Sequence, residues 1–276
     1  MTHSPAAIVD THCHLNLAAF KPDLDAVLER ASDAGITKIL VPGMDLASSQ
    51  QAISLANEHP ALYAAVGVHP HDAKKWSSST REQLEKLARD PKVVAIGEIG
   101  LDFYRNYSDP EIQRQAFKKQ LELASDLQLP VIIHNREAGH DILPILEDWS
   151  ASLPTPLIGR AGVLHAFSSD GESASKVIEQ GFYLGIAGPI TFRNAESLRE
   201  LVGKVPLERL LTETDAPYLT PEPYRGKRNE PGYVRYVATE IASICQVESE
   251  RVHEQTSANA LKLFQWNHET TNSYIL

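Results

Sequence analysis

Short apolar runs recur eight times along this chain, and each is followed by a longer stretch with the periodicity of a helix. Seven intervals separate His12, just past the first run, from Asp215, just past the last, with a mean of 29 residues that suits a repeating strand–helix unit. This alternation predicts a parallel sheet with right-handed crossovers, and eight units suit closure into a barrel. We therefore expect the α/β class, as a single (β/α)8 TIM barrel. The expected strands cover residues 7–10, 36–42, 62–68, 93–99, 130–134, 162–165, 182–187 and 210–214.

The pattern after the last strand predicts two closing C-terminal helices, over residues 231–245 and 249–263. A length of 276 residues lies within the usual range of one barrel, and no linker or low-complexity tract divides the chain. We expect one domain over residues 1–267 and a short tail over residues 268–276.

Composition limits the kinds of partner. The formal net charge of −10 argues against a protein that coats nucleic acid through a broad basic surface, but it leaves room for an enzyme that engages a few phosphates. The two cysteines, Cys13 and Cys245, indicate free thiols rather than a disulfide framework. The sequence has neither an apolar run as long as a membrane span nor the pattern of a signal peptide, so we expect a cytoplasmic protein without a membrane partner.

Histidines and carboxylates gather where the expected strands end, and barrel enzymes place their active sites at these ends. Six of the 11 histidines lie there, whereas chance placement over the chain would bring about one. The residues at these positions are His12, His14, His69, His71, Glu98, His134, His165 and Asp215.

His12 and His14 are two residues apart on an extended segment, so both imidazoles point to the same face and Cys13 points away as a packing thiol. Such a pair alone is weak evidence for a metal, but histidines or carboxylates follow at four other strand ends. We interpret both histidines as metal ligands. His134 and His165 each end a buried run, where a lone histidine is more often a hydrogen-bonded core residue. Their place on adjacent strands, next to an acidic strand, favours ligation instead.

That acidic strand contains Glu98, a carboxylate that is costly to bury unless it is paired or bound to metal. A salt bridge is the alternative. A carboxylate that bridges two cations fits better, because two close cations need a shared anionic ligand. Asp102 is a candidate acceptor of a hydrogen bond from one of the ligands.

The ligands separate into two sites. Strands one and eight are neighbours in a closed barrel and supply His12, His14 and Asp215, whereas strands five and six supply His134 and His165, and Glu98 could touch both cations. Mixed nitrogen and oxygen ligation admits two ions of Zn²⁺, Mn²⁺ or Mg²⁺, with imidazole favouring the first two. Asp215 is also the candidate catalytic residue, because it could accept the proton of the attacking water.

With these residues in place, the sequence resembles the TatD family of metal-dependent deoxyribonucleases. The matching segments are residues 10–14, 67–70, 97–102, 130–134, 162–168, 213–218 and 225–231. The resemblance implies a TIM barrel, a two-metal centre on the six ligands named above, and hydrolysis of phosphodiester bonds at DNA ends. One departure is Ala166-Phe167-Ser168-Ser169, where many members have cysteine and then Ser-Gly, and we expect this loop to alter the substrate mouth.

The resemblance gives meaning to residues outside the ligand set. It implies that His69 and His71 either face the substrate or support the metal ligands from behind, against the alternative of ordinary loop histidines. Arg225, Lys227 and Arg228 form a basic cluster in which Arg225 is the candidate phosphate contact, although such runs are usually a solvated face. Tyr218 and Tyr224 are candidates for stacking on a base, although loop tyrosines more often simply pack.

Other functions stay open at this level. Related barrel hydrolases that act on amides, lactones or phosphotriesters bridge their metals with a carbamylated lysine, and this chain has Glu98 there instead. Removal of a D-amino acid from tRNA is attributed to some relatives and is a second alternative. A binding module without catalysis is the remote one, but it would have lost ligands and all six are present. Metal identity, cleavage polarity and oligomeric state are open, and a monomer is compatible with the predicted site.

Overall fold

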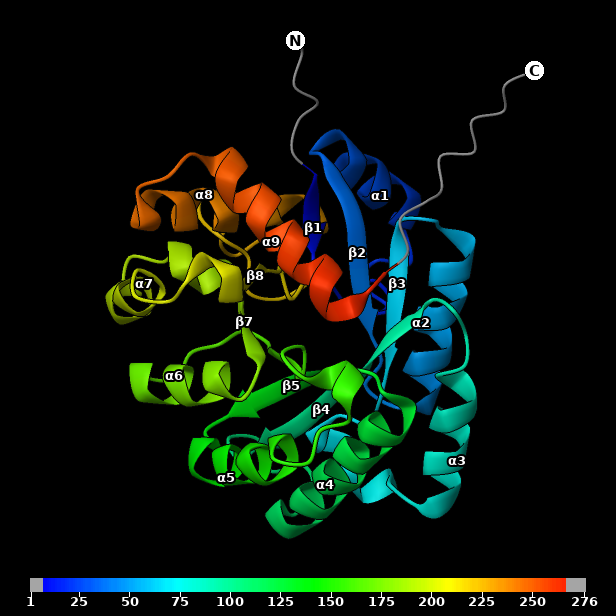
Figure 1. The fold of residues 1–276 in the computed structure, drawn as a ribbon. Helices are drawn as coiled ribbons and strands as arrows, with labels where there is room; N and C mark the ends of the chain where they lie inside the picture. The colour runs from blue at the N-terminus through cyan, green and yellow to red at the C-terminus, as the bar shows by residue number, and fades with distance from the viewer. Residues whose placement is uncertain (1–6, 267–276) are drawn as a thin grey trace, which may run out of the picture.

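The structure is a computed structural model that describes residues 7–266. Within these residues, eight parallel strands form one sheet in the order β1 to β8, with helices packed around it (Figure 1). The predicted (β/α)8 barrel is therefore confirmed. The strands are β1 (Ile8–Asp10), β2 (Ile36–Pro42), β3 (Leu62–Val66), β4 (Val93–Asp102), β5 (Val131–Arg136), β6 (Gly162–Leu164), β7 (Phe182–Ile186) and β8 (Leu210–Thr212).

Seven helices connect successive strands, and two more follow β8 as the sequence predicts. They are α1 (Leu24–Asp33), α2 (Leu46–Glu58), α3 (Ser78–Leu87), α4 (Pro110–Leu127), α5 (Gly139–Ser150), α6 (Gly171–Glu179), α7 (Glu196–Val202), α8 (Val234–Cys245) and α9 (Ser249–Phe264). None of the helices among the described residues is long and apolar enough to cross a membrane. The expected tail at 268–276 lies outside the described residues.

Strands β1 and β8 close the barrel through the segments that follow them. The Thr11 amide donates to the Thr212 carbonyl at 3.1 Å, and the His14 amide donates to the Ala216 carbonyl at 2.8 Å. The Asp215 amide donates in turn to the His12 carbonyl at 2.8 Å. Three expected ligands are thus held together by main-chain hydrogen bonds across the seam.

Two apolar layers follow from the alternation of side chains along the strands. In β2, Leu40 points to an inner cluster that has members from every strand, whereas Ile39 and Val41 pack in the outer cluster with the helices. Phe264, the last residue of α9, and Trp266, two residues further on, also belong to the inner cluster. Because apolar side chains fill the barrel interior, polar side chains can gather only toward the carboxyl ends of the strands.

Two strands run further than the sequence indicates. β4 continues to Asp102, and β5 continues past His134 to Arg136, so His134 lies inside its strand instead of ending it. Both cysteines are free, as expected, and Cys13 is fully buried. Burial raises the pKa of its thiol well above the usual value, which suits a packing role.

Candidate metal centre

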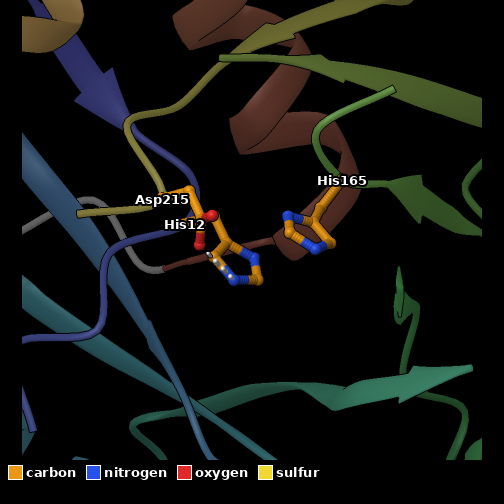
Figure 2. A group of neighbouring side chains, drawn as sticks. All are labelled: His12, His165 and Asp215. Atoms are coloured by element: carbon orange, nitrogen blue, oxygen red, sulfur yellow. Dashed lines mark ion pairs between the residues drawn. The ribbon is translucent and has the colours of Figure 1, made fainter. Parts of the chain in front are cut away.

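His12, His14 and Asp215 bring their polar atoms together at the seam of the barrel. His12 Nε2 lies 3.2 Å from His14 Nε2. The Asp215 Oδ1 atom lies 3.4 Å from His14 Nε2 and 3.8 Å from His12 Nε2. Figure 2 shows Asp215 beside His12, together with His165, whose ring stacks on that of His12 with centroids 4.1 Å apart. We call His12, His14 and Asp215, together with Glu98 Oε2, the seam group.

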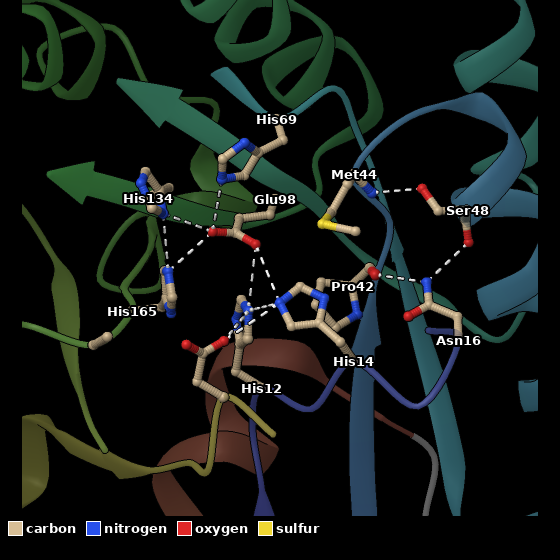
Figure 3. A network of polar contacts seen from close by, with 12 residues as sticks. His12, His14, Asn16, Pro42, Met44, Ser48, His69, Glu98, His134 and His165 are labelled. Atoms are coloured by element: carbon tan, nitrogen blue, oxygen red, sulfur yellow. Dashed lines mark hydrogen bonds and ion pairs between the residues drawn. The ribbon is translucent and has the colours of Figure 1, made fainter. Parts of the chain in front are cut away.

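Glu98 extends from β4 between this group and a second one. Its Oε2 atom lies 3.4 Å from His12 Nε2 and 3.6 Å from His14 Nε2. Its Oε1 atom lies 2.9 Å from both His134 Nδ1 and His165 Nε2, which are themselves 3.3 Å apart (Figure 3). We call His134, His165 and Glu98 Oε1 the opposite group. Each carboxylate oxygen of Glu98 therefore faces a different set of imidazoles.

Glycines on either side of Glu98 allow β4 to approach β5 this closely. A Cβ atom at Gly97 would lie 2.6 Å from the Ile132 Cβ, and one at Gly100 would overlap the His134 carbonyl oxygen. Gly100 also has φ +141, a conformation that side-chain-bearing residues rarely adopt. The glycine spacing in this strand thus positions Glu98 against His134.

The distances suit a divalent cation. In a tetrahedral zinc site, donor atoms about 2.0–2.1 Å from the ion lie roughly 3.4 Å from one another. In the seam group, the two imidazole nitrogens lie 3.2 Å apart, and each lies 3.4 to 3.8 Å from Glu98 Oε2 and from Asp215 Oδ1. Among the described residues, three sets are placed to hold a metal: His12 with His14 and Glu98, His12 with His165 and Asp215, and His69 with Glu98 and His134.

Two buried carboxylates support the histidines from behind. Asp102 Oδ2 contacts His134 Nε2 at 3.1 Å, as the sequence suggested, and His71 Nε2 at 2.8 Å. Glu213, which is fully buried, accepts a hydrogen bond from the Ala166 amide and lies 3.6 Å from His165 Nδ1. A carboxylate at the far nitrogen fixes the ring orientation and the tautomer of a metal-binding histidine.

Sequence reasoning missed Glu213 and Asp10. The spacing that places His12 and His14 on one face also applies to Glu213 and Asp215, and it could have revealed Glu213. Asp10 accepts hydrogen bonds from the His12 amide at 3.2 Å, the Thr214 amide at 3.0 Å and the Thr214 hydroxyl at 2.6 Å. Burial raises the pKa of Asp10 to about 8, although hydrogen bonds from Thr214 and His12 act to lower it.

The electrostatics of the centre favour the anionic form of Glu98 and of Asp215 and the neutral form of His69. Burial alone would raise the pKa of Glu98, but His165, His69 and His12 hold it well below its usual value. Burial likewise opposes ionisation of Asp215, and His14, His165 and His12 lower its pKa in spite of it. Burial lowers the pKa of His69 to about 4, although Glu98 acts to raise it. His69 is therefore neutral at neutral pH.

The residues expected to contact substrate lie at different distances from the metal centre and have different partners. His69 Nε2 lies 3.5 Å from Glu98 Oε1, closer to the centre than the sequence indicated, whereas His71 contacts Asp102. Arg225 is exposed and stacks on the Phe192 ring at 4.2 Å, with no ion pair among the described residues. Arg228, in contrast, pairs with Asp23 and Glu230. Within the basic cluster, Arg225 is therefore available to bind a phosphate, whereas Arg228 is already paired with carboxylates.

The two candidate tyrosines differ in exposure, as do the residues of the loop after β6. Tyr224 stacks on Tyr233 with ring centroids 4.5 Å apart, so it packs as loop tyrosines usually do. Tyr218 is 55% exposed, and its ring centroid lies 6.3 Å from that of His14. In the loop after β6, Phe167 is buried in the core, and the Asn135 amide donates to the Ser169 hydroxyl at 3.4 Å. The expected effect of Ala166 and Ser169 on the substrate mouth stays a prediction.

Comparison with known proteins identifies the family. The model of the TatD-related DNase family matches residues 9–265. A metal-dependent hydrolase of Bacillus subtilis, YabD, is 41% identical over 94% of this chain and 100% of its own length. The 3′-5′ ssDNA/RNA exonuclease TatD of Erwinia tasmaniensis is also 41% identical, over 92% of this chain and 98% of its own. The crystal structure of the TatD homologue YjjV from Escherichia coli has a TM-score of 0.87 and 33% identity, covering 94% of this chain and 98% of that one. The expectation of a hydrolytic enzyme is thereby confirmed, and the chain belongs to the TatD-related DNase family.

Proposed function

We propose that this enzyme is a two-metal phosphodiesterase that removes nucleotides from the 3′ end of single-stranded DNA, and of RNA as a second substrate. The observation that carries the proposal is the placement of Glu98, whose two oxygens face two separate sets of imidazoles. Relatives of about 41% identity named as 3′-5′ ssDNA/RNA exonucleases support the substrate and the polarity.

In this proposal each group would hold one divalent cation. His12, His14 and Asp215 would hold one ion, His134 and His165 would hold the other, and Glu98 would supply one carboxylate oxygen to each site. Imidazole-rich ligation favours Zn²⁺ or Mn²⁺ over Mg²⁺. When bound, the cations lower the pKa of water and offset the negative charge of the phosphate.

The protein's own residues position and deprotonate the reactants. Asp215 accepts the proton of the attacking water, because it is a low-pKa carboxylate whose side chain is still 14% exposed at the mouth. Asp102 and Glu213, at the far nitrogens of His134 and His165, would keep these rings in the tautomers whose near nitrogen can bind a cation.

Three residues outside the ligand set contact the substrate in this proposal. Neutral His69, which lies beside Glu98, hydrogen-bonds to the substrate near the scissile phosphate. His71 is partly exposed, contacts Asp102 and faces the bound nucleic acid. Arg225 contacts a backbone phosphate, since its guanidinium has no carboxylate partner among the described residues.

The other activities have less support. A D-aminoacyl-tRNA deacylase is not favoured, because exonucleases recur among the named relatives at about 40% identity. A binding module without catalysis is not favoured either, because all six expected ligands come together. The cytoplasmic location stays a prediction of the sequence, and the oligomeric state stays open.

The proposal is tested with purified protein that has been stripped of metal and reloaded with Zn²⁺, Mn²⁺ or Mg²⁺. The substrates are 5′-labelled single-stranded DNA, single-stranded RNA, duplex DNA and D-aminoacyl-tRNA. We expect metal-dependent, stepwise shortening of the single strands from the 3′ end. Internal cutting, shortening from the 5′ end, or release of the D-amino acid without shortening of DNA would each contradict it.

A further inference from the structure

A groove of about 610 Å³ opens beside the metal centre, between the start of α2 and the segment that follows β3. His69 joins the two, because it lines the groove and also lies 3.5 Å from Glu98 Oε1 (Figure 3). The His69 amide donates to the Met44 carbonyl at 2.9 Å, which holds both walls together. The volume is in the range of pockets that accept a small organic ligand.

One wall of the groove is an exposed aromatic ring. Tyr107 lines the groove and is 59% exposed. Its ring meets His71 edge to face, with centroids 4.8 Å apart and planes at 70°, and this contact leaves most of the ring surface accessible. Met44, Ser48 and Gln51 supply a thioether, a hydroxyl and an amide to the remaining lining. Such a mixture suits a flat heterocycle with hydrogen-bonding edges.

The charges around the groove do not favour a phosphate. Asp45 and Asp72 line it, and Lys75 bonds to both, at 3.3 Å and 2.9 Å. Lys74 adds one more cation to the lining. The groove thus has no excess of positive charge, whereas the adjacent metal centre is built for an anion. A ligand that spans the two would place its phosphate at the centre and its uncharged part in the groove.

We propose that this groove binds the nucleoside next to the scissile phosphate, with its base stacked on Tyr107. This inference rests on the proposed nuclease function and adds the residue that holds the base. Stacking on a single aromatic side chain changes affinity by roughly ten- to hundredfold. It tolerates different bases, because every base has a flat face.

The test uses the metal-loaded full chain and a single-stranded oligonucleotide with 2-aminopurine at its last or penultimate 3′ position. The 3′-terminal linkage is replaced by a non-hydrolysable phosphonate, so binding is measured without cleavage. We expect the wild type to quench the 2-aminopurine at one of these positions. Tyr107→Ala should lose the quenching and weaken binding at least about tenfold, and Tyr107→Phe should retain both. Tyr104→Ala is the matched control, because Tyr104 lies on the same loop and is 50% exposed but does not line the groove.

Quenching that is absent from the wild type, that persists in Tyr107→Ala, or that is lost equally in Tyr104→Ala would overturn the groove assignment. Shortening of the unmodified strand by the wild type is measured in parallel. If that shortening occurs and the quenching result is negative, only the groove assignment fails. If the wild type never shortens the strand in any metal, the proposed function fails and this inference fails with it.

Discussion

Glu98 determines the geometry of the centre, because one carboxylate contacts both sets of imidazoles from a strand that is buried along its whole length. Burying a charge in such a place is costly unless cations or hydrogen bonds compensate it. The histidines around it supply those contacts in the structure. Because each residue of the centre has its own contacts, substitutions of different residues should change metal content and activity in different ways.

The substitution Glu98→Gln keeps the volume of the side chain and removes the bridging anion. We expect the metal content to fall from about two ions per chain toward one and activity to fall by orders of magnitude. Metal analysis after gel filtration, with activity measured on the same sample, checks this. Glu85→Gln on α3 is the control, since Glu85 is on the surface. Full activity with both ions retained would show that another group bridges.

The substitution Asp215→Asn tests the proton acceptor. We expect near-normal KM and a loss in kcat of at least about a hundredfold, as for the removal of a general base. The measurement is kcat, KM and metal content on one preparation. A loss of tenfold or less at full metal content would assign proton transfer to a different group and leave Asp215 as a ligand only.

Metal affinity should depend on pH through His134 and His165. Burial acts to lower the pKa of both, but contacts with Asp102, Glu98 and Glu213 outweigh it and raise the pKa above the usual value. A cation must displace these protons, so affinity should rise as pH rises from roughly 6 to 8. Calorimetry in buffers of different protonation enthalpy should detect the released protons. Affinity that is constant over this range would mean that neither histidine loses a proton on binding.

At the scale of elements, the seam between β1 and β8 decides whether the centre can form. The hydrogen bonds of the His14 and Asp215 amides across the seam set the distance between ligands from opposite ends of the chain. Asp10 reinforces them by accepting from His12 and Thr214. The two ends of the barrel therefore share one buried carboxyl group.

Removal of that group should weaken the seam. We expect Asp10→Ala to lower the free energy of unfolding by about 3 kcal/mol, because it leaves buried donors without an acceptor. Asp10→Asn keeps one acceptor oxygen and should cost less. Urea unfolding at a fixed metal concentration measures both, with the exposed Asp33→Ala on α1 as the control. Equal stability of Asp10→Ala and the wild type would show that the main-chain bonds suffice.

At the scale of the whole molecule, a net charge of −10 means that a polyanionic substrate meets general repulsion and local attraction. The attraction must come from the metal centre and a few free cations. Arg225 is one such cation, whereas Arg228 forms ion pairs with Asp23 and Glu230.

Arg225→Ala should therefore raise KM for DNA with little effect on kcat and reduce the salt dependence of binding. The expected change in slope is about 0.7, the value for one phosphate contact on a single strand. Titration of a labelled oligonucleotide at several salt concentrations measures it. Arg89→Ala is the control, because Arg89 lies just after α3 and its side chain is exposed. An unchanged slope would identify Arg225 as part of a solvated surface.

Much of the fold is readable from the sequence because its signals are local. The order of Ile39, Leu40 and Val41 within an apolar run is enough to identify a strand, and the structure places these side chains alternately in the two apolar layers. The histidine pair after β1 needs only the geometry of an extended chain. The ends of β4 and β5 were less readable, because the last residues of each strand, up to Asp102 and Arg136, are held by pairing with each other rather than by a local apolar pattern.

The sequence by itself determined the barrel, its closing helices and the six residues expected to bind metal, since strand period and strand order depend on the chain alone. The tertiary structure decided which atoms meet: that His134 approaches Glu98 through Nδ1, that Glu213 lies behind His165, and that Arg228 is neutralised by Asp23. The physical reason is that these contacts join residues far apart in the chain, 205 positions in the last case. Their distances depend on how the strands pack and close, and no local pattern records that.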